Sequence, residues 1–153
     1  ADQYLIERLL TIMTQDPMIG AAYARQLPTA DCGIIERYTR EFNYGENSLI
    51  KTAEDIPQMG IKTFFCSDVC AMYRRNIYLS VGGFVRHTIF NEDMICAGTM
   101  IQKGYKVAYA ADARVIHSRQ WNSFTGILIW QFLRQIIRKY FRELLQKGKE
   151  CDW

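Results

Sequence analysis

Segments with helical and with strand-like spacing of apolar residues alternate along this chain. Apolar side chains recur at helical spacing in residues 2–14, and a small apolar run at 21–26 indicates a buried strand. Within residues 1–118, further helices are predicted at 31–42, 75–81 and 92–103, and further strands at 61–65, 69–73, 105–110 and 114–117. This alternation favours an α/β fold, with a mixed sheet and flanking helices.

Capping residues support the helix boundaries. Asp2, Asp31 and Asn91 are predicted N-caps, and Gly104 is a predicted C-cap. Residues 43–60 contain several Gly, Asn, Ser and Pro residues and are predicted to form a long irregular loop. Long loops in compact domains are usually functional or mobile.

The composition indicates a globular domain without a membrane span. Of 153 residues, 49% are hydrophobic and 23% are charged. The longest uncharged stretch, 120–133, is shorter than the roughly 20 apolar residues that cross a bilayer. Charges at Asp2, Glu7 and Arg8 argue against a signal peptide. Five irregularly spaced cysteines without a C-x-x-C pair predict reduced thiols and a cytoplasmic location.

Positive charge is concentrated at the C-terminal end. Residues 119–153 hold seven Lys and Arg against three Asp and Glu, whereas 1–118 are nearly neutral. A long helix is predicted from 122 to 146, with a wide apolar stripe among basic residues, so 119–153 is expected to be a basic amphipathic helix and tail. This helix either packs on protein or lies on an anionic membrane surface. The basic charge is too small to predict nucleic-acid binding.

Common catalytic and nucleotide-binding motifs are absent from the sequence. It contains no G-x-G-x-x-G, no G-x-x-x-x-G-K-[ST], no G-x-S-x-G and no H-E-x-x-H. His87 and His117 are the two histidines, which excludes a multi-histidine metal centre.

Three places carry side chains with possible chemistry. Glu92 and Asp93 stand at a predicted helix start, where they either complement the helix dipole or provide a general base. Asp68 lies in an apolar stretch and is expected to be a buried carboxylate, which needs a partner. Either it forms an ion pair with Arg74 or Arg75, or it contacts substrate. His117 follows a predicted apolar strand. It is either an ordinary residue at a strand end or a contact to metal or phosphate.

Five short motifs follow one another in a specific order. They are FFCSDVCAMYRR at 64–75, VGGF at 81–84, NEDM at 91–94, GYKVAY at 104–109 and ARVIHS at 113–118. From about residue 1 to 135, the chain resembles the C-terminal half of a bacterial family 2 glycosyltransferase. It most resembles the rhamnosyltransferase-like branch that builds surface polysaccharides.

The resemblance implies a GT-A fold and the transfer of a sugar from a nucleotide-sugar donor to a saccharide or lipid-linked acceptor, with inversion. Residues 1–118 then form the acceptor-side half of the catalytic domain. Asp93 is the implied base, Glu92 orients it or binds acceptor, and His117 approaches the donor diphosphate or its Mg²⁺ or Mn²⁺. The implied substrate-binding residues are Ser67, Asp68, Arg75 and Asn91.

The metal-binding Asp-x-Asp of this family has no counterpart in the sequence. We therefore expect the chain to be a fragment that binds donor weakly and is inactive alone. Its uncovered apolar surface predicts a homodimer. The basic segment suggests a cytoplasmic protein at the inner face of the plasma membrane. The alternative functions are a non-catalytic binding or assembly module and a membrane-peripheral scaffold.

Overall fold

The computed structural model describes residues 2–88 and 91–117. The predicted helix at 122–146 lies outside these residues, so it stays a prediction. Among the described residues, no helix is long and apolar enough to cross a membrane. The four cysteines in this part of the chain all carry free thiols, as the sequence predicts.

A four-stranded mixed sheet forms the centre of the fold, with strand order β2-β4-β1-β3. The long strands β1 (Ile19–Leu27) and β4 (Lys106–Ile116) are parallel neighbours. Short strands flank them antiparallel, β2 (Leu49–Lys51) beside β4 and β3 (Ala71–Tyr73) beside β1. The predicted α/β fold with a mixed sheet is confirmed.

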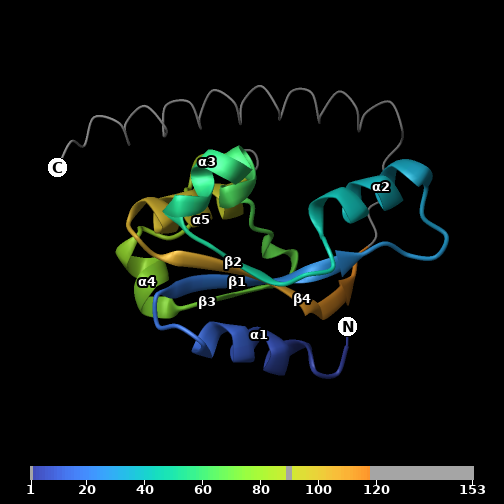
Figure 1. The fold of residues 1–153 in the computed structure, drawn as a ribbon, viewed down its shortest axis with the longest axis horizontal. Coiled ribbons are helices and arrows are strands. Elements are labelled where there is room, and N and C mark those ends of the chain that lie inside the picture. Colours follow the sequence, from blue (N-terminus) through green and yellow to red (C-terminus); the bar gives the residue numbers. More distant parts are fainter. Residues whose placement is uncertain (1, 89–90, 118–153) are drawn as a thin grey trace. The chain divides into compact units, whose positions relative to one another are not determined.

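Helices cover both faces of this sheet (Figure 1). They are α1 (Leu5–Thr14), α2 (Ile34–Asn43), α3 (Ile56–Met59), α4 (Arg75–Ser80) and α5 (Glu92–Gln102). On one face α1 packs through Leu9, Ile12 and Met13 against alanines of β1 and β4, and these small side chains let the helix approach closely. On the opposite face α5 contributes a second set of buried residues, among them Met100 and Ile101.

The C-terminal end of α5 follows the sequence prediction. Gly104 takes a left-handed φ of +81°. Its N–H donates to the carbonyl of Ile101 at 3.0 Å, and the N–H of Tyr105 donates to the carbonyl of Met100 at 2.9 Å. This pair of hydrogen bonds is the Schellman motif, for which glycine is favoured because it has no Cβ.

Two of the three predicted N-caps differ from the observed ones, which are Tyr4 for α1 and Gly33 for α2. α1 begins at Leu5, and the Asp2 carboxylate accepts from the N–H of Tyr4 at 2.9 Å, ahead of the helix. α2 begins at Ile34 after Gly33, so the prediction of Asp31 as its cap was wrong. Asn91 is the N-cap residue of α5, as predicted, with a φ of +66°, although its side chain makes no capping hydrogen bond.

The segment 43–60, predicted to be an irregular loop, contains regular structure. β2 lies within it and is followed by a 3₁₀ helix, η1 (Ala53–Asp55), and by α3. A reciprocal capping box between Thr52 and Asp55 starts this helical segment. The loop prediction was wrong here because a single short strand and two helical turns leave little periodicity in the sequence.

Two strand predictions also need correction. Residues 61–65 are not a strand, because Gly60–Phe64 form the 3₁₀ helix η2; a short apolar run does not distinguish these conformations. The predicted strand at 69–73 divides into η3 (Asp68–Cys70) and β3. The two strands predicted at 105–117 are one continuous strand, β4, whose apparent break matches a register irregularity opposite Ala24 and Arg25.

We expect Gly83→Ala to lower the free energy of unfolding by roughly 1–3 kcal/mol. Gly83 has a φ of +66°, and an added Cβ would lie 2.9 Å from the Tyr78 ring. The hydroxyl of Tyr78 accepts a hydrogen bond from the N–H of Phe84 at 3.0 Å, so the ring is not free to move away. Urea unfolding measures the loss. Gly45→Ala is the control, because nothing lies within 4 Å of its added Cβ, and equal losses in both variants would contradict this reasoning.

Candidate active site

A set of polar residues gathers at the carboxyl ends of the two parallel strands. Gln26 is the last residue but one of β1, and His117 directly follows β4. The N–H of His117 donates to the carbonyl of Leu27 at 3.2 Å, which joins the two strand ends. In open α/β sheets, this edge is where ligands bind.

Asp93 lies in the first turn of α5 and is half-buried. Its Oδ1 accepts the N–H of Met94 at 2.7 Å, and its Oδ2 accepts the N–H of Asp68 at 3.2 Å. The second bond spans 25 residues of sequence and connects α5 to the segment that precedes β3. Asp93, Ser67 and Asp68 are called the Asp93 group below.

Burial raises the pKa of Asp93 to about 6. The two backbone N–H groups on the carboxylate oppose this rise, while the negative charges of Asp68 and Glu92 add to it. The carboxylate is therefore mostly ionised at pH 7, and it is a stronger base than an exposed aspartate, whose pKa is about 4. A pKa close to the working pH is a property of effective general bases.

Weak acids that stay protonated lie near this carboxylate. Burial raises the pKa of Cys66 and Tyr44 to about 12 and that of Cys96 to about 11, and in each case the charge of Asp93 contributes. Burial raises the pKa of Tyr73 still further. These groups are neutral near pH 7, whereas Asp93 titrates close to it.

Ser67 is buried and connects the Asp93 group to β1. Its hydroxyl oxygen accepts a hydrogen bond from Nε2 of Gln26 at 2.6 Å. Gln26 is itself only 2% exposed, which is unusual for a polar residue at a strand end. A buried amide requires hydrogen-bond partners, so this contact fixes both side chains.

Lys51 is a buried cation next to the segment that carries Ser67 and Asp68. The sequence did not indicate its burial. It is 1% exposed, and its ammonium group donates to the carbonyl of Phe65 and, at 3.2 Å, to the hydroxyl of Tyr23. The ring centroids of Tyr23 and Phe65 lie 4.9 and 5.9 Å from Nζ. Burial lowers the pKa of Lys51 to about 8. Because Phe65 stands two residues before Ser67, Lys51 supports the backbone that carries the Asp93 group.

The other predicted substrate-binding residues differ in their surroundings. Asp68 is exposed, so the prediction of a carboxylate buried in an apolar stretch was wrong. Of its two alternatives, an ion pair with Arg74 is not formed, because Arg74 donates instead to the carbonyls of Ile19 and Met13. Arg75 is exposed at the start of α4, and no described hydrogen bond or ion pair joins it to the Asp93 group.

Asn91 and Glu92 stand directly before Asp93, and both are half-buried. Asn91 takes the left-handed conformation that asparagine tolerates better than most residues, and its carbonyl accepts the N–H of Ile95 at 2.9 Å. It is the N-cap residue of α5 through its backbone, without a side-chain capping hydrogen bond. Glu92 is the first residue of α5, one position ahead of Asp93.

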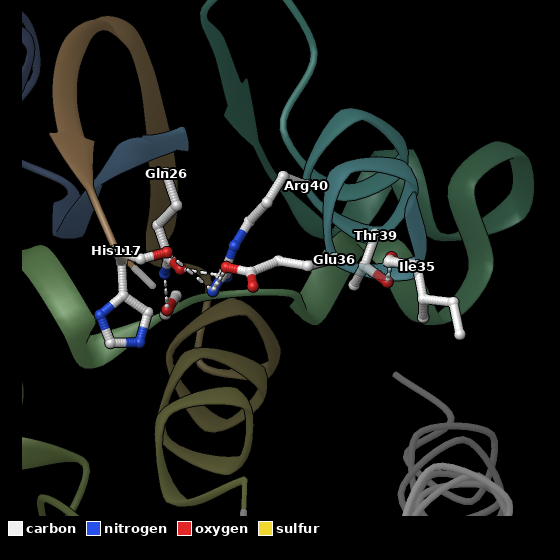
Figure 2. A network of polar contacts seen from close by, with 7 residues as sticks. Gln26, Ile35, Glu36, Thr39, Arg40 and His117 are labelled. Atoms are coloured by element: carbon white, nitrogen blue, oxygen red, sulfur yellow. Dashed lines mark hydrogen bonds and ion pairs between the residues drawn. The ribbon is translucent and has the colours of Figure 1, made fainter. Parts of the chain in front are cut away.

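His117 reaches the Asp93 group through a polar network rather than directly. The guanidinium of Arg40 donates to Oε1 of Gln26 and, at 3.3 Å, to the carbonyl of His117 (Figure 2). Gln26 in turn donates to Ser67. Within residues 2–88 and 91–117, no three His, Cys, Asp or Glu side chains are grouped so that they could hold a metal ion. The predicted metal contact of His117 is therefore not part of a metal site built by the described residues.

The chain is similar to curated bacterial glycosyltransferases that act in polysaccharide biosynthesis. The O-antigen chain rhamnosyltransferase WbaN of Salmonella anatum is 41% identical over 136 residues, which are 89% of this chain and 40% of the relative. The O-antigen chain rhamnosyltransferase RfbN of Salmonella typhimurium is 45% identical over 121 residues, which are 79% of this chain and 38% of the relative. The chain thus spans about two-fifths of each relative. No family model matches it.

These similarities support the rhamnosyltransferase-like resemblance predicted from the sequence motifs. Membership of family 2, the GT-A fold and the role of each site residue stay predictions.

Proposed function

We propose that this chain is the acceptor-side part of a family 2, GT-A glycosyltransferase. The reaction is transfer of a rhamnosyl group from a nucleotide-sugar to a saccharide or lipid-linked acceptor, with inversion, during surface polysaccharide synthesis. The observation that carries the proposal is Asp93, a half-buried carboxylate with a pKa of about 6 that accepts the N–H of Asp68, next to the Ser67 that Gln26 of β1 holds. Similarity to two O-antigen chain rhamnosyltransferases supports the choice of sugar and acceptor.

In the proposed step, an acceptor hydroxyl attacks the anomeric carbon of the donor. A new C–O bond forms on one face of the sugar as the bond to the nucleoside diphosphate breaks on the other, which inverts the configuration. The hydroxyl proton passes to the carboxylate of Asp93, and the diphosphate leaves with its electron pair. Backbone N–H groups of Met94 and Asp68 orient the carboxylate for this transfer.

The surrounding residues bind and orient the substrates in this proposal. Glu92 orients Asp93 or contacts the acceptor, while Ser67 and Asp68 line the pocket for sugar and acceptor. Asn91 and Arg75 complete the substrate-binding set. Ser67 is suited to a positioning role because it is buried and held by Gln26, and Asp68 is suited to a direct contact because it is exposed.

The proposal places His117 toward the donor diphosphate, where the family resemblance implies Mg²⁺ or Mn²⁺. Since the described residues do not group three ligands, further ligands would have to come from elsewhere in the protein. The 153 residues alone are then inactive. We further propose a cytoplasmic homodimer, associated with the inner face of the plasma membrane through 119–153, and the basic charge of that segment supports this association.

Sugar transfer by the natural full-length protein tests the proposed function. The protein is incubated with nucleotide-activated rhamnose and a lipid-linked saccharide acceptor, and products are analysed by mass spectrometry and NMR. We expect one rhamnose to be added per transfer, with inverted anomeric configuration and release of nucleoside diphosphate. Retention of the anomeric configuration would exclude the proposed inverting mechanism. Binding of saccharide without transfer from any nucleotide-sugar would favour the non-catalytic module.

The pH profile of kcat/KM is expected to show an acidic limb with an apparent pKa of about 6. Only the ionised carboxylate of Asp93 accepts a proton, so the rate falls as the pH drops below 6 and levels off above it. An exposed aspartate would place the limb near pH 4, about two units lower. Because kcat/KM reports the free enzyme, the comparison is made at low substrate concentration. A limb near pH 4 would show that the base is a well-solvated carboxylate instead.

A further inference from the structure

The outward face of α2 is apolar, and the side toward the fold is charged. Four side chains of the outward face are 87%, 58%, 67% and 55% exposed, namely Ile34, Ile35, Tyr38 and Phe42. The side chains of Glu36 and Arg40 are only 12% and 13% exposed. No residue of α2 is fully buried. From this charged side, Arg40 donates hydrogen bonds to Gln26 near the end of β1 and to His117 just after β4.

The guanidinium of Arg40 joins three separate pieces of chain (Figure 2). Nη1 donates to Oε1 of Gln26, at the end of β1. Nη2 donates to the carbonyl of His117, just after β4, at 3.3 Å, and lies 4.0 Å from a carboxylate oxygen of Glu36. One side chain of α2 thus contacts the carboxyl ends of both parallel strands.

The side-chain amide of Gln26 extends these contacts toward Asp93. Its oxygen accepts from Arg40, so its nitrogen faces the other way and donates to Ser67 at 2.6 Å. The next residue along the chain, Asp68, donates its N–H to the carboxylate of Asp93. A continuous series of contacts therefore leads from Arg40 to the candidate base.

We infer that Arg40 is a positioning residue for the reaction, which acts through Gln26 to hold Ser67 and Asp68 against Asp93 while fixing the backbone at His117. This inference rests on the proposed function, in which Asp93 takes the acceptor proton. Arg40 itself touches neither substrate nor the reacting atoms in this role. Its effect is to keep the base and the strand end that carries His117 in a fixed arrangement.

Arginine suits this role better than lysine. Its planar guanidinium carries several donors in a fixed fork, so one side chain can bind an amide oxygen and a backbone carbonyl together. A lysine ammonium is a compact point charge on a flexible stem. Arg40→Lys should therefore preserve the charge and lose the fixed geometry, which separates positioning from a general electrostatic effect.

The test compares Arg40→Met, Arg40→Lys and Arg37→Met in the natural full-length protein. Arg37 is the matched control because it is exposed on the same helix, and its side chain donates to the carbonyl of Ala30, at 3.3 Å, rather than to either strand end. Two quantities are measured: the split between kcat and KM in rhamnosyl transfer, and the pKa of Asp93 from ¹³C NMR of its labelled carboxyl group.

We expect Arg40→Met to lower kcat on the order of 10²-fold, the effect of misplacing a catalytic group by about 1 Å. The pKa of Asp93 should rise above its value of about 6, because a displaced Asp68 no longer donates its N–H to the carboxylate. Arg40→Lys should shift both quantities in the same direction by less. Arg37→Met should leave both unchanged.

The inference would be overturned if Arg40→Met had the same kcat and the same Asp93 pKa as Arg37→Met. If Arg40→Met does not fold, Arg40→Lys decides, and an unshifted Asp93 pKa in that variant is equally contrary. The NMR titration does not depend on catalysis. A shifted pKa in a protein that transfers no sugar would therefore reject the proposed function while retaining the coupling between Arg40 and Asp93.

Discussion

Replacing Asp93 by asparagine in the natural full-length protein is expected to lower the turnover of sugar transfer by roughly 10²–10⁴-fold, the usual range for loss of a general base. The substitution keeps the size of the side chain and an oxygen that can accept the N–H of Met94 or of Asp68. It removes the charge that takes the acceptor proton. The loss should therefore fall on kcat, with a smaller change in KM.

A matched aspartate separates this effect from a general change of charge. Asp112 is exposed in the middle of β4, and its backbone carbonyl, not its side chain, accepts the guanidinium of Arg8. Asp112→Asn is expected to leave turnover unchanged. Equal activity of Asp93→Asn and the unmodified protein would exclude Asp93 as the base, and Glu92 would then be the next residue to replace.

The acidic limb in the pH profile provides an independent check on the same residue. In Asp93→Asn, any residual transfer should lose the limb near pH 6, because the group that titrates there is gone. A residual limb at that pH would assign the titration to another side chain.

Features that depend on nearby residues could be predicted from the sequence. The apolar spacing in α1 and α5 and the glycine after α5 depend on contacts a few residues apart, and the structure has them where expected. The adjacency of Glu92 and Asp93 at a helix start is equally local. Helix starts were predicted less accurately, because α2 begins after Gly33 rather than Asp31, and Asn91 is the N-cap of α5 without the side-chain hydrogen bond that its identity suggested.

The rest of the candidate site depends on contacts between distant parts of the chain. Gln26 and Ser67 are 41 residues apart, and Arg40 and His117 are 77 residues apart. Neither Gln26 nor Arg40 lies in a recognisable motif, and polar residues are ordinarily exposed. The burial of Lys51 could not be predicted for the same reason, since it results from the pairing of β2 with β4 and from the aromatic rings around the side chain.

The identity of an apolar residue also does not determine its burial, and two phenylalanines show this. Phe64 is 1% exposed in η2, and Phe42 is 55% exposed at the end of α2. Both residues belong to sequence patterns that suggest an apolar face. The structure places Phe64 in the core. It leaves Phe42 in contact with Lys62, whose Nζ lies 3.7 Å from the centroid of the Phe42 ring.

We expect Phe64→Ala to lower the free energy of unfolding by roughly 3–5 kcal/mol, because it removes a fully buried ring and leaves a cavity that the neighbouring backbone can fill only in part. Phe42→Ala loses the exposed cation–π contact with Lys62 and the ring contact with Tyr38, and its cost should be about 0.5–1.5 kcal/mol. Denaturant unfolding compares the two variants through their midpoints at an unchanged slope. Similar losses for both would mean that η2 is not part of the core. A large loss confined to Phe64→Ala would show that the segment leading to Ser67 and Asp68 is held by apolar packing as well as by Lys51.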